Sequence, residues 1–287
     1  MMSEPLLVAL NYSGGVQSEW MLWRVLLGLV ERPKYFAVFN ANPGMENGRT
    51  QPHVDAMRFE CAKQGIDFVT APGPDLLQDI LAIKTNGRTR LDTPPYWTPG
   101  KREVGTLKQA CTKHYKIAPM DRAVRLWLKR RWGIGLRNHR ALRTGAVEKW
   151  IGFTADEQPR ADSVTRSKHQ RYVSFRFPLI DDGLTKSDIV DEFISRGLPL
   201  PERSMCNACP YHGLRSLKQM HDERPVDWAQ AVAVDESIRD WSQIGVKEPC
   251  FVSKTLLPLT VLAERGFDLG NDLKNDLHQC SSGVCFV

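Results

Sequence analysis

The sequence lacks any apolar run of the ~20 residues that a membrane-spanning helix needs. Its first residues include Glu4 and only a five-residue apolar run, Leu6–Leu10, which argues against a secretory signal peptide. Internal repeats and low-complexity tracts are also absent, and this excludes solenoid and fibrous classes. The balance of 42% hydrophobic and 25% charged residues is that of a globular protein. We therefore predict a soluble cytoplasmic protein without a membrane partner.

A disulfide framework is also not expected, because the chain has an odd number of cysteines and no signal peptide. Cys206 and Cys209 form a Cys-x-x-Cys turn, which places two thiolates together and suits Zn²⁺ or an iron–sulfur cluster. Cys280 and Cys285 form a second close pair. Cys61 lies in an amphipathic pattern and is predicted to be a core residue. The full set is Cys61, Cys111, Cys206, Cys209, Cys250, Cys280 and Cys285.

Acidic residues are scarce between Arg122 and Lys149, where nine basic residues face a single acid, Glu148. Trp127 and Trp132 are interleaved with the basic residues. Such a segment could follow a nucleic-acid backbone, with the aromatic rings available for stacking on bases. A solvated helix face explains the same composition equally well. We predict tRNA or DNA binding here, close to the nucleotide end of the sheet, through Arg130, Arg131, Arg137 and Arg140.

The chain has no Walker A loop, but a different glycine turn follows its first apolar run. Two glycines let the backbone fold around an anion, two serines add hydroxyl donors, and a helix-forming run begins at once. The N–H groups at a helix start bind phosphate favourably. We predict that a nucleotide phosphate binds at Ser13, Gly14, Gly15, Val16, Gln17 and Ser18. The alternative is an ordinary glycine-containing turn.

Strand-like and helix-like patterns alternate along the chain, which predicts an α/β fold with a mostly parallel, doubly wound sheet. Such sheets bind ligands at the carboxyl ends of their strands. From about residue 199 the pattern changes to short elements with cysteines. We predict a nucleotide-binding domain over 1–198 and a helical, cysteine-rich extension over 199–287. The expected strands are Leu6–Tyr12, Tyr35–Asn40, Ile66–Thr70, Trp150–Thr154 and Val173–Phe177, and the expected helices are Val16–Glu31, Pro52–Gln64, Glu103–Lys116, Asp121–Arg131, Ser187–Ser195 and Pro225–Ile238.

A pair of carboxylates follows the apolar run Trp150–Thr154. Asp156 and Glu157 at a strand tip could hold Mg²⁺ beside a nucleotide. Arg160 could bind a phosphate group through two parallel hydrogen bonds. A surface turn with a local ion pair is the alternative.

Five ordered segments together resemble the PP-loop ATP pyrophosphatase superfamily, in the branch grouped with phosphoadenosine phosphosulfate (PAPS) reductase and the DNA phosphorothioation sulfurtransferase. They are Ser13–Ser18, Ala41–Glu46, Cys111–Pro119, Ile151–Arg160 and Cys206–Tyr211. The resemblance implies an adenine nucleotide alpha hydrolase-like fold that binds ATP and adenylates a substrate. This chain departs from the pattern at Gln17 and Asn42, where Asp is usual, and at Pro43, where Thr is usual.

The resemblance also implies roles for individual residues. Asn42, Gly44 and Glu46 would lie next to the nucleotide, and Lys116 would face its phosphates or a sulfate-like group. Cys111 would be a ligand of a 4Fe–4S cluster. Five cysteines then compete for four positions, because Cys206 and Cys209 could be joined by Cys280 and Cys285, or by Cys111 and one tail cysteine. In the first case Cys111 stays free as a nucleophile or persulfide carrier. Zn²⁺ is the alternative to iron.

Three functions fit these expectations. The first is an enzyme that adenylates a nucleic acid and inserts sulfur, served by a possible sulfur donor protein. The second is a reductase of a small sulfonucleotide, with Cys285 as nucleophile. The third is a partner subunit that binds nucleotide and cluster without turnover. The substrate and the oligomeric state stay open.

Overall fold

The computed structural model describes residues 4–83, 85, 91–100, 103–135, 138, 142–167 and 170–268. Its main sheet has five strands in the order β3-β2-β1-β6-β7, and every neighbouring pair is parallel. The mostly parallel α/β fold predicted from the sequence is therefore confirmed. The strands are β1 (Leu7–Asn11), β2 (Phe36–Asn40), β3 (Asp67–Thr70), β6 (Val147–Trp150) and β7 (Val173–Arg176).

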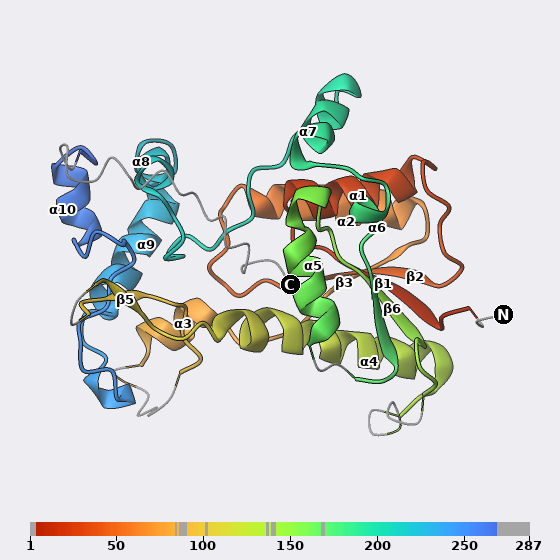
Figure 1. The fold of residues 1–287 in the computed structure, drawn as a ribbon, viewed down its shortest axis with the longest axis horizontal. Helices are drawn as coiled ribbons and strands as arrows, with labels where there is room; N and C mark the ends of the chain where they lie inside the picture. The colour runs from red at the N-terminus through yellow and green to blue at the C-terminus, as the bar shows by residue number, and fades with distance from the viewer. Residues whose placement is uncertain are drawn as a thin grey trace.

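Helices cover both faces of this sheet (Figure 1). Val8 and Leu10 of β1 pack into one core, whereas Leu7 and Ala9 pack into the core on the opposite face. A strand buried on both faces needs a continuous apolar run, as β1 has. The first core is covered by α1 (Val16–Leu26), α2 (Thr50–Lys63) and α7 (Lys186–Ser195), the second by α4 (Ala118–Trp132), and a smaller one by α5 (Gln158–Arg166).

The strand order reverses beside β1. The chain first moves outward through β2 and β3, and then crosses back through α4 to place β6 on the other side of β1. Ligands of open parallel sheets bind outside the carboxyl ends of the strands at such a reversal. The fold therefore directs attention to the segments that follow β1 and β6.

A further core, separate from those on the sheet, lies at one end of the molecule (Figure 1). Ile80 and Tyr96 pack there with Leu217, Ala231 and Leu262, so residues on both sides of position 198 share it. The division into two domains at that position stays a prediction. The elements here are α3 (Leu76–Leu81), β4 (Trp97–Thr98), β5 (Gly105–Thr106), α8 (Leu214–Glu223), α9 (Pro225–Ser237), η4 (Ser242–Ile244) and α10 (Leu259–Glu264).

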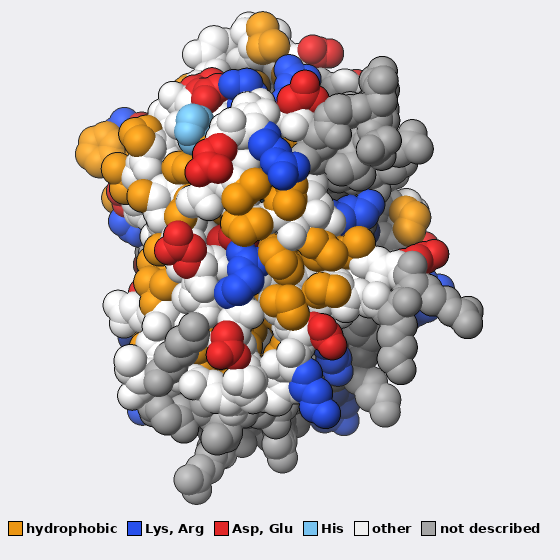
Figure 2. Space-filling model, turned by 90° about the vertical axis from the view of Figure 1, so that its left-hand side faces the viewer, with side chains coloured by type: hydrophobic (Ala, Val, Ile, Leu, Met, Phe, Trp, Pro, Cys, Tyr) orange, Lys and Arg blue, Asp and Glu red, His pale blue; other side chains and the backbone are white. Residues whose placement is uncertain are grey.

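The face that this end presents is shown in Figure 2, where hydrophobic side chains gather in the middle and charges of both signs surround them. The described residues on that face carry charges of both signs and not the stripe of positive charge that suits nucleic acid. No helix within the described part of the chain is long and apolar enough to cross a membrane.

Three predicted elements are wrong in their bounds. The helix expected over Val16–Glu31 is α1, which ends at Leu26. The expected helix Glu103–Lys116 begins instead with β5, because Gly105 and Thr106 pair with β4, and only its end is helical as the π-helix η1 (Thr112–Ile117). The strand expected at Trp150–Thr154 is β6, which ends at Trp150. The residues beyond it leave the sheet and form η3 (Ala155–Glu157), which leads into α5, and a short helix, α6 (Pro178–Asp181), follows β7.

Candidate nucleotide site and cysteine segments

The glycine turn directly after β1 is closed by its own hydroxyl groups. The Ser13 amide donates to Ser18 Oγ over 3.1 Å, and Ser18 Oγ donates to the Gly15 carbonyl over 3.1 Å. Gly14 adopts φ +76°, and a Cβ there would lie 2.6 Å from Thr50 Cγ2 of α2. The loop can therefore press against α2 only if this position is glycine.

The start of α1 has no side-chain cap among the described residues, and Gly15 is its N-cap. The first N–H groups of a helix have no partner within it, and together with the helix dipole they favour a bound anion. A phosphate group is the natural ligand of this geometry.

The segment after β6 lies against the same helix start. The Gln17 side-chain amide donates to Glu157 Oε2 over 2.7 Å, and Thr154 Oγ1 donates to the same oxygen over 3.0 Å. Gly152 permits this close approach, since a Cβ there would lie 3.1 Å from the Ser18 nitrogen. The structure thus brings the glycine turn and the predicted carboxylate pair together at the strand-order reversal.

The two carboxylates of that pair have different surroundings. Glu157 is buried, and its Oε1 accepts from Arg160 over 2.5 Å and lies 3.2 Å from Lys186 Nζ. Burial opposes ionisation of Glu157, but the charges of Arg160 and Lys186 outweigh it and lower the pKa. The Asp156 side chain is 45% exposed. Asp156 is therefore the carboxylate that a ligand can reach.

A second charged group borders the glycine turn from the other side. Lys116 Nζ of η1 donates to Glu46 Oε1 over 2.6 Å, and Ser204 Oγ donates to Glu46 Oε2 over 3.2 Å. The buried Ser204 lies over the glycine turn, because a Cβ at Gly15 would be 3.4 Å from Ser204 Cβ. Sequence reasoning missed Ser204, since a single serine outside any motif carries no signal.

The turn after β2 is held by local hydrogen bonds. Asn42 Oδ1 accepts from the Gly44 amide over 2.8 Å, which is an Asx-type turn that aspartate could also form. Gly44 adopts φ +81°. This turn sets the position of Glu46, which follows two residues later.

The Cys-x-x-Cys turn packs beside the Glu46 turn. Cys206 and Glu46 form an isolated antiparallel bridge, and the Asn207 amide donates to the Met45 carbonyl over 2.8 Å. His212 is half-buried, and desolvation lowers its pKa to about 4, so the ring is neutral at pH 7. Its Nε2 lies 3.0 Å from the Cys206 carbonyl oxygen and donates to it. His212 thus holds the cysteine turn in place.

Cys111 begins the π-helix that contains Lys116. Burial raises the pKa of the Cys111 thiol, while the nearby charge of Lys116 opposes that rise. π-Helical turns are rare and occur often at functional sites. Cys61 and Cys250, by contrast, are core residues, and burial raises their pKa values to about 12 and about 11.

Cys280 and Cys285 lie outside the described residues. Within the described part, no group of three or more His, Cys, Asp or Glu side chains is arranged to hold a metal ion. The choice of ligands among the five candidate cysteines therefore stays a prediction.

The basic segment does not lie where the sequence predicted. Arg131 stacks over the rings of Tyr35 and Trp132, at 5.5 Å and 4.8 Å from their centroids, and Trp132 Nε1 donates to the Leu6 carbonyl. Leu6 and Tyr35 directly precede β1 and β2, so this is the amino edge of the sheet (Figure 1). The expected position of Arg130 and Arg131 near the nucleotide is wrong, because a crossover helix returns the chain to the opposite edge.

Two other members of the segment are engaged inside the protein. Trp127 is 5% exposed and its Nε1 donates to Asp67 over 2.7 Å, so it is not available to stack on bases. Lys149 is buried and ion-paired with Asp121. Arg137 and Arg140 lie outside the described residues. The nucleic-acid prediction thus rests mainly on the exposed end of α4.

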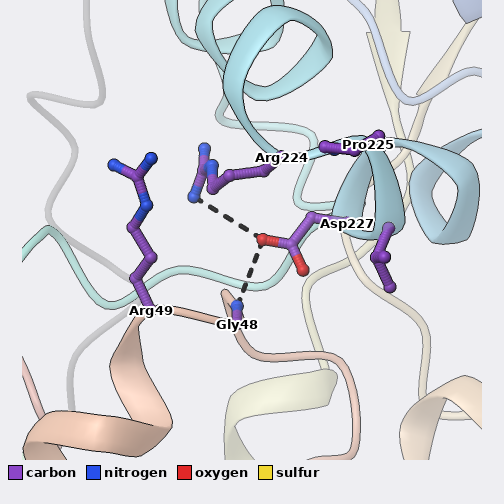
Figure 3. Close-up of a pocket in the computed structure, with 6 residues that line it drawn as sticks. Gly48, Arg49, Arg224, Pro225 and Asp227 are labelled. Carbon is purple, nitrogen blue, oxygen red and sulfur yellow. Dashed lines mark hydrogen bonds and ion pairs between the residues drawn. The ribbon is translucent and has the colours of Figure 1, made fainter.

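A small pocket of about 190 Å³ lies between the start of α2 and the start of α9 (Figure 3). The Asp227 carboxylate accepts from the Gly48 amide over 3.1 Å and lies 3.8 Å from Arg224 Nη1. Arg49 pairs with Glu202 and with Glu223. Both arginines are paired with carboxylates, and these pairs join the two halves of the chain at the pocket.

No family model and no curated protein matches this sequence. Among solved structures, the chain is similar to the U34-tRNA thiolase NcsA from Methanococcus maripaludis with its 4Fe–4S cluster, at 12% identity over 92% of this chain and 82% of that chain, with a TM-score of 0.39. It is also similar to the NH3-dependent NAD synthetase from Campylobacter jejuni subsp. jejuni in complex with the nitrate ion. The identity is 15% over 85% of this chain and 89% of that chain, and the TM-score is 0.30. Likenesses this distant assign no activity, substrate or cofactor to the chain.

Proposed function

We propose that this chain is an ATP-dependent enzyme of the PP-loop type that adenylates a nucleic-acid substrate and then transfers sulfur to it; a reductase that acts on a small sulfonucleotide is the alternative. One observation supports this most. The uncapped start of α1 lies at the strand-order reversal. Arg160 donates to Glu157, which accepts from Gln17 of α1, and Lys116 donates to Glu46 beside the glycine turn. Backbone donors and two cations near one helix start suit a polyphosphate better than any uncharged ligand.

The chemistry follows from that placement. The phosphates of ATP bind over Ser13–Ser18, and a substrate oxygen attacks the α-phosphorus and displaces pyrophosphate. Lys116 and Arg160 stabilise the negative charge that accumulates on the phosphoryl oxygens. In the sulfur-transfer case, a sulfur nucleophile then displaces AMP from the adenylated substrate.

Mg²⁺ is the proposed metal partner of ATP. Asp156 has an accessible carboxylate and would hold the ion together with the phosphate oxygens. Glu157 is already bonded to Gln17, Arg160 and Thr154, and therefore acts as a positioning residue that ties α1 to the end of β6.

The cysteine segments suit a 4Fe–4S cluster, with zinc as the alternative. Cys111, Cys206 and Cys209 lie on segments around one core, and a tail cysteine, Cys280 or Cys285, would complete the set. The cluster would supply an iron site that holds or activates sulfur. Lys116 links the two proposed centres, because its charge opposes the rise that burial causes in the pKa of Cys111 and because it donates a hydrogen bond to Glu46 beside the glycine turn.

The first test is anaerobic purification followed by iron and zinc counts and assays of pyrophosphate release. We expect iron with charge-transfer absorption, and ATP-dependent pyrophosphate release that needs tRNA or DNA. Cys206→Ala should be colourless. A wild-type preparation with zinc alone would overturn the cluster, and a preparation that never releases pyrophosphate would overturn adenylation.

Lys116→Ala should lower the rate of pyrophosphate release by about 100-fold, because one charged donor to the transition state is worth roughly 3 kcal/mol. Lys113→Ala is the matched control, since Lys113 is an exposed lysine in the same π-helix and should keep the wild-type rate. Equal rates for Lys116→Ala and wild type would remove Lys116 from the site.

Two candidate substrates fit the proposed function, a nucleic acid and a small sulfonucleotide. Nucleic acid is favoured by the basic composition of the Arg122–Lys149 segment. A small sulfonucleotide is favoured by the position of Arg131 at the amino edge of the sheet, away from the glycine turn.

Reversing Arg130 and Arg131 to glutamate separates these candidates. If nucleic acid binds the end of α4, the double variant should bind tRNA or DNA at least 10-fold more weakly, with a smaller dependence on salt, and bind ATP as wild type does. Lys218→Glu on α8 is the control for a change of charge elsewhere. If wild type binds neither tRNA nor DNA at low salt, the sulfonucleotide is the better substrate.

A further inference from the structure

Cations from three separate segments gather at the amino edge of the sheet. Lys34 Nζ lies 5.4 Å and the Arg131 guanidinium 5.5 Å from the centroid of the same ring, that of Tyr35. Arg131 also stacks over Trp132, at 4.8 Å from its centroid. The rings of Tyr35 and Trp132 pack edge to face with their centroids 4.7 Å apart, so a pair of aromatic rings holds both cations.

Arg143 joins this group through the residues that lead into β1. Trp132 Nε1 donates to the Leu6 carbonyl over 3.1 Å, and the Arg143 guanidinium donates to the Glu4 carbonyl two residues earlier. Arg143 is exposed and precedes β6, as Lys34 precedes β2. The group therefore follows the amino ends of β2, β1 and β6, which are neighbours in the sheet.

The positive charge of this group is only partly offset. Lys34 and Arg131 are exposed, and within the described part of the chain neither forms an ion pair with a carboxylate. Glu4 adds one exposed acid at the same edge. The helix dipole explains Arg131 in the last turn of α4, but it does not explain Lys34 and Arg143, which lie on other segments. An anion that contacts all three segments explains the whole group.

We propose that the amino-edge surface, formed by Lys34, Arg131 and Arg143, binds the phosphate backbone of the nucleic-acid substrate. This inference rests on the proposed function and states where that substrate is held. A guanidinium group binds phosphate through two parallel hydrogen bonds. Because stacking on the aromatic rings already orders Lys34 and Arg131, less entropy is lost when the anion binds.

The position of this surface sets a lower limit to the size of the substrate. The amino-edge surface lies at the start of β1 and the glycine turn at its end, and the five residues of β1 span about 17 Å. Duplex DNA rises about 3.4 Å per base pair, so about five base pairs cover this straight distance. The substrate is therefore a duplex or folded nucleic acid longer than that, and not a mononucleotide or dinucleotide.

The test measures the binding of tRNA and of duplex DNA to wild type, Lys34→Glu and Arg143→Glu as a function of salt. Lys34 lies outside the basic segment of the sequence, so it reports on the folded surface and not on the composition of one helix. Lys34→Glu should bind the nucleic acid about 10-fold more weakly, with a salt dependence smaller by about one phosphate contact. Arg143→Glu should do the same, and both variants should bind ATP as wild type does.

Lys218→Glu is the matched control, because Lys218 is an exposed lysine of α8 at the opposite end of the molecule (Figure 1). It should keep the wild-type affinity for nucleic acid. The comparison of tRNA with DNA identifies which nucleic acid binds. An oligonucleotide of about four nucleotides should displace the longer nucleic acid but should not stimulate pyrophosphate release, because it cannot span the distance to the glycine turn. Stimulation by that oligonucleotide would overturn the size limit.

The outcomes separate this inference from the proposed function. If nucleic acid stimulates pyrophosphate release but Lys34→Glu and Arg143→Glu bind it as wild type does, the inference is wrong and the proposed function stands. If wild type binds neither tRNA nor DNA at low salt, both the inference and the nucleic-acid substrate are wrong. Adenylation would still be decided by pyrophosphate release with a sulfonucleotide.

Discussion

Replacing Gly15 with valine is expected to weaken ATP binding at least 100-fold while the fold stays intact. Gly15 has φ −101° and ψ 166°, a conformation that any residue adopts, and a Cβ there would lie at an ordinary 3.4 Å from Ser204 Cβ. The methyl groups of valine, however, would occupy the space in front of the first N–H groups of α1. Calorimetric titration with ATP and thermal unfolding of the same preparation measure the two effects.

Two other glycines make this experiment specific. Gly14→Ala should unfold the protein at a lower temperature, because φ is +76° and the new Cβ would lie 2.6 Å from Thr50 Cγ2. Gly213→Ala should change neither property, since nothing lies within 4 Å of its Cβ position. ATP affinity in Gly15→Val equal to that of wild type would refute the phosphate site.

The sequence predicted the elements whose signals are local. β1 is a continuous apolar run followed by two glycines, so both the buried parallel strand and the turn after it could be read directly. The pairing of Lys116 with Glu46 joins residues 70 positions apart, and no local pattern indicates it. The resemblance to a known family indicated both residues, but their contact is a property of the folded chain.

Other features depend on tertiary packing and could not be predicted. The basic stripe on α4 was visible in the sequence, but the edge of the sheet at which it ends depends on the direction of a crossover helix. The burial of Trp127 in the core followed from that same packing. Ser204 over the glycine turn is a single residue whose position arises only from its neighbours.

A buried carboxyl group beneath the glycine turn gives a second large effect. Glu19 of α1 is 0% exposed, accepts from Tyr12 Oη over 3.0 Å and lies 3.3 Å from His53 Nδ1. Burial raises the pKa of Glu19 from 4.5 to about 8. The folded protein therefore holds a proton that the unfolded chain releases, and stability falls as the pH rises from 4.5 to 8.

His212 changes stability in the opposite sense, because its folded pKa of about 4 lies below the ordinary value of 6.5. The unfolded chain then binds the extra proton, and stability rises between those two values. The contribution of Glu19 is cleanest between about pH 6.5 and pH 8, where His212 is neutral in the folded protein and loses its remaining proton in the unfolded chain. Over that interval we expect wild type to lose on the order of 2 kcal/mol of unfolding free energy.

Glu19→Gln should remove most of this loss, because glutamine keeps an acceptor for Tyr12 but has no proton to release. Urea unfolding at pH 6.5, 7.2 and 8 measures the unfolding free energy of each protein. Glu60→Gln is the control, because Glu60 is a carboxylate on the surface of α2 whose partner is Lys63. Glu60→Gln should follow the wild-type dependence, since a surface ion pair contributes only about 0–1 kcal/mol. If Glu19→Gln and wild type lose stability in parallel, Glu19 is already ionised in the folded protein. His53 would then be its counter-ion, and the assignment of a protonated carboxyl group to Glu19 would be wrong.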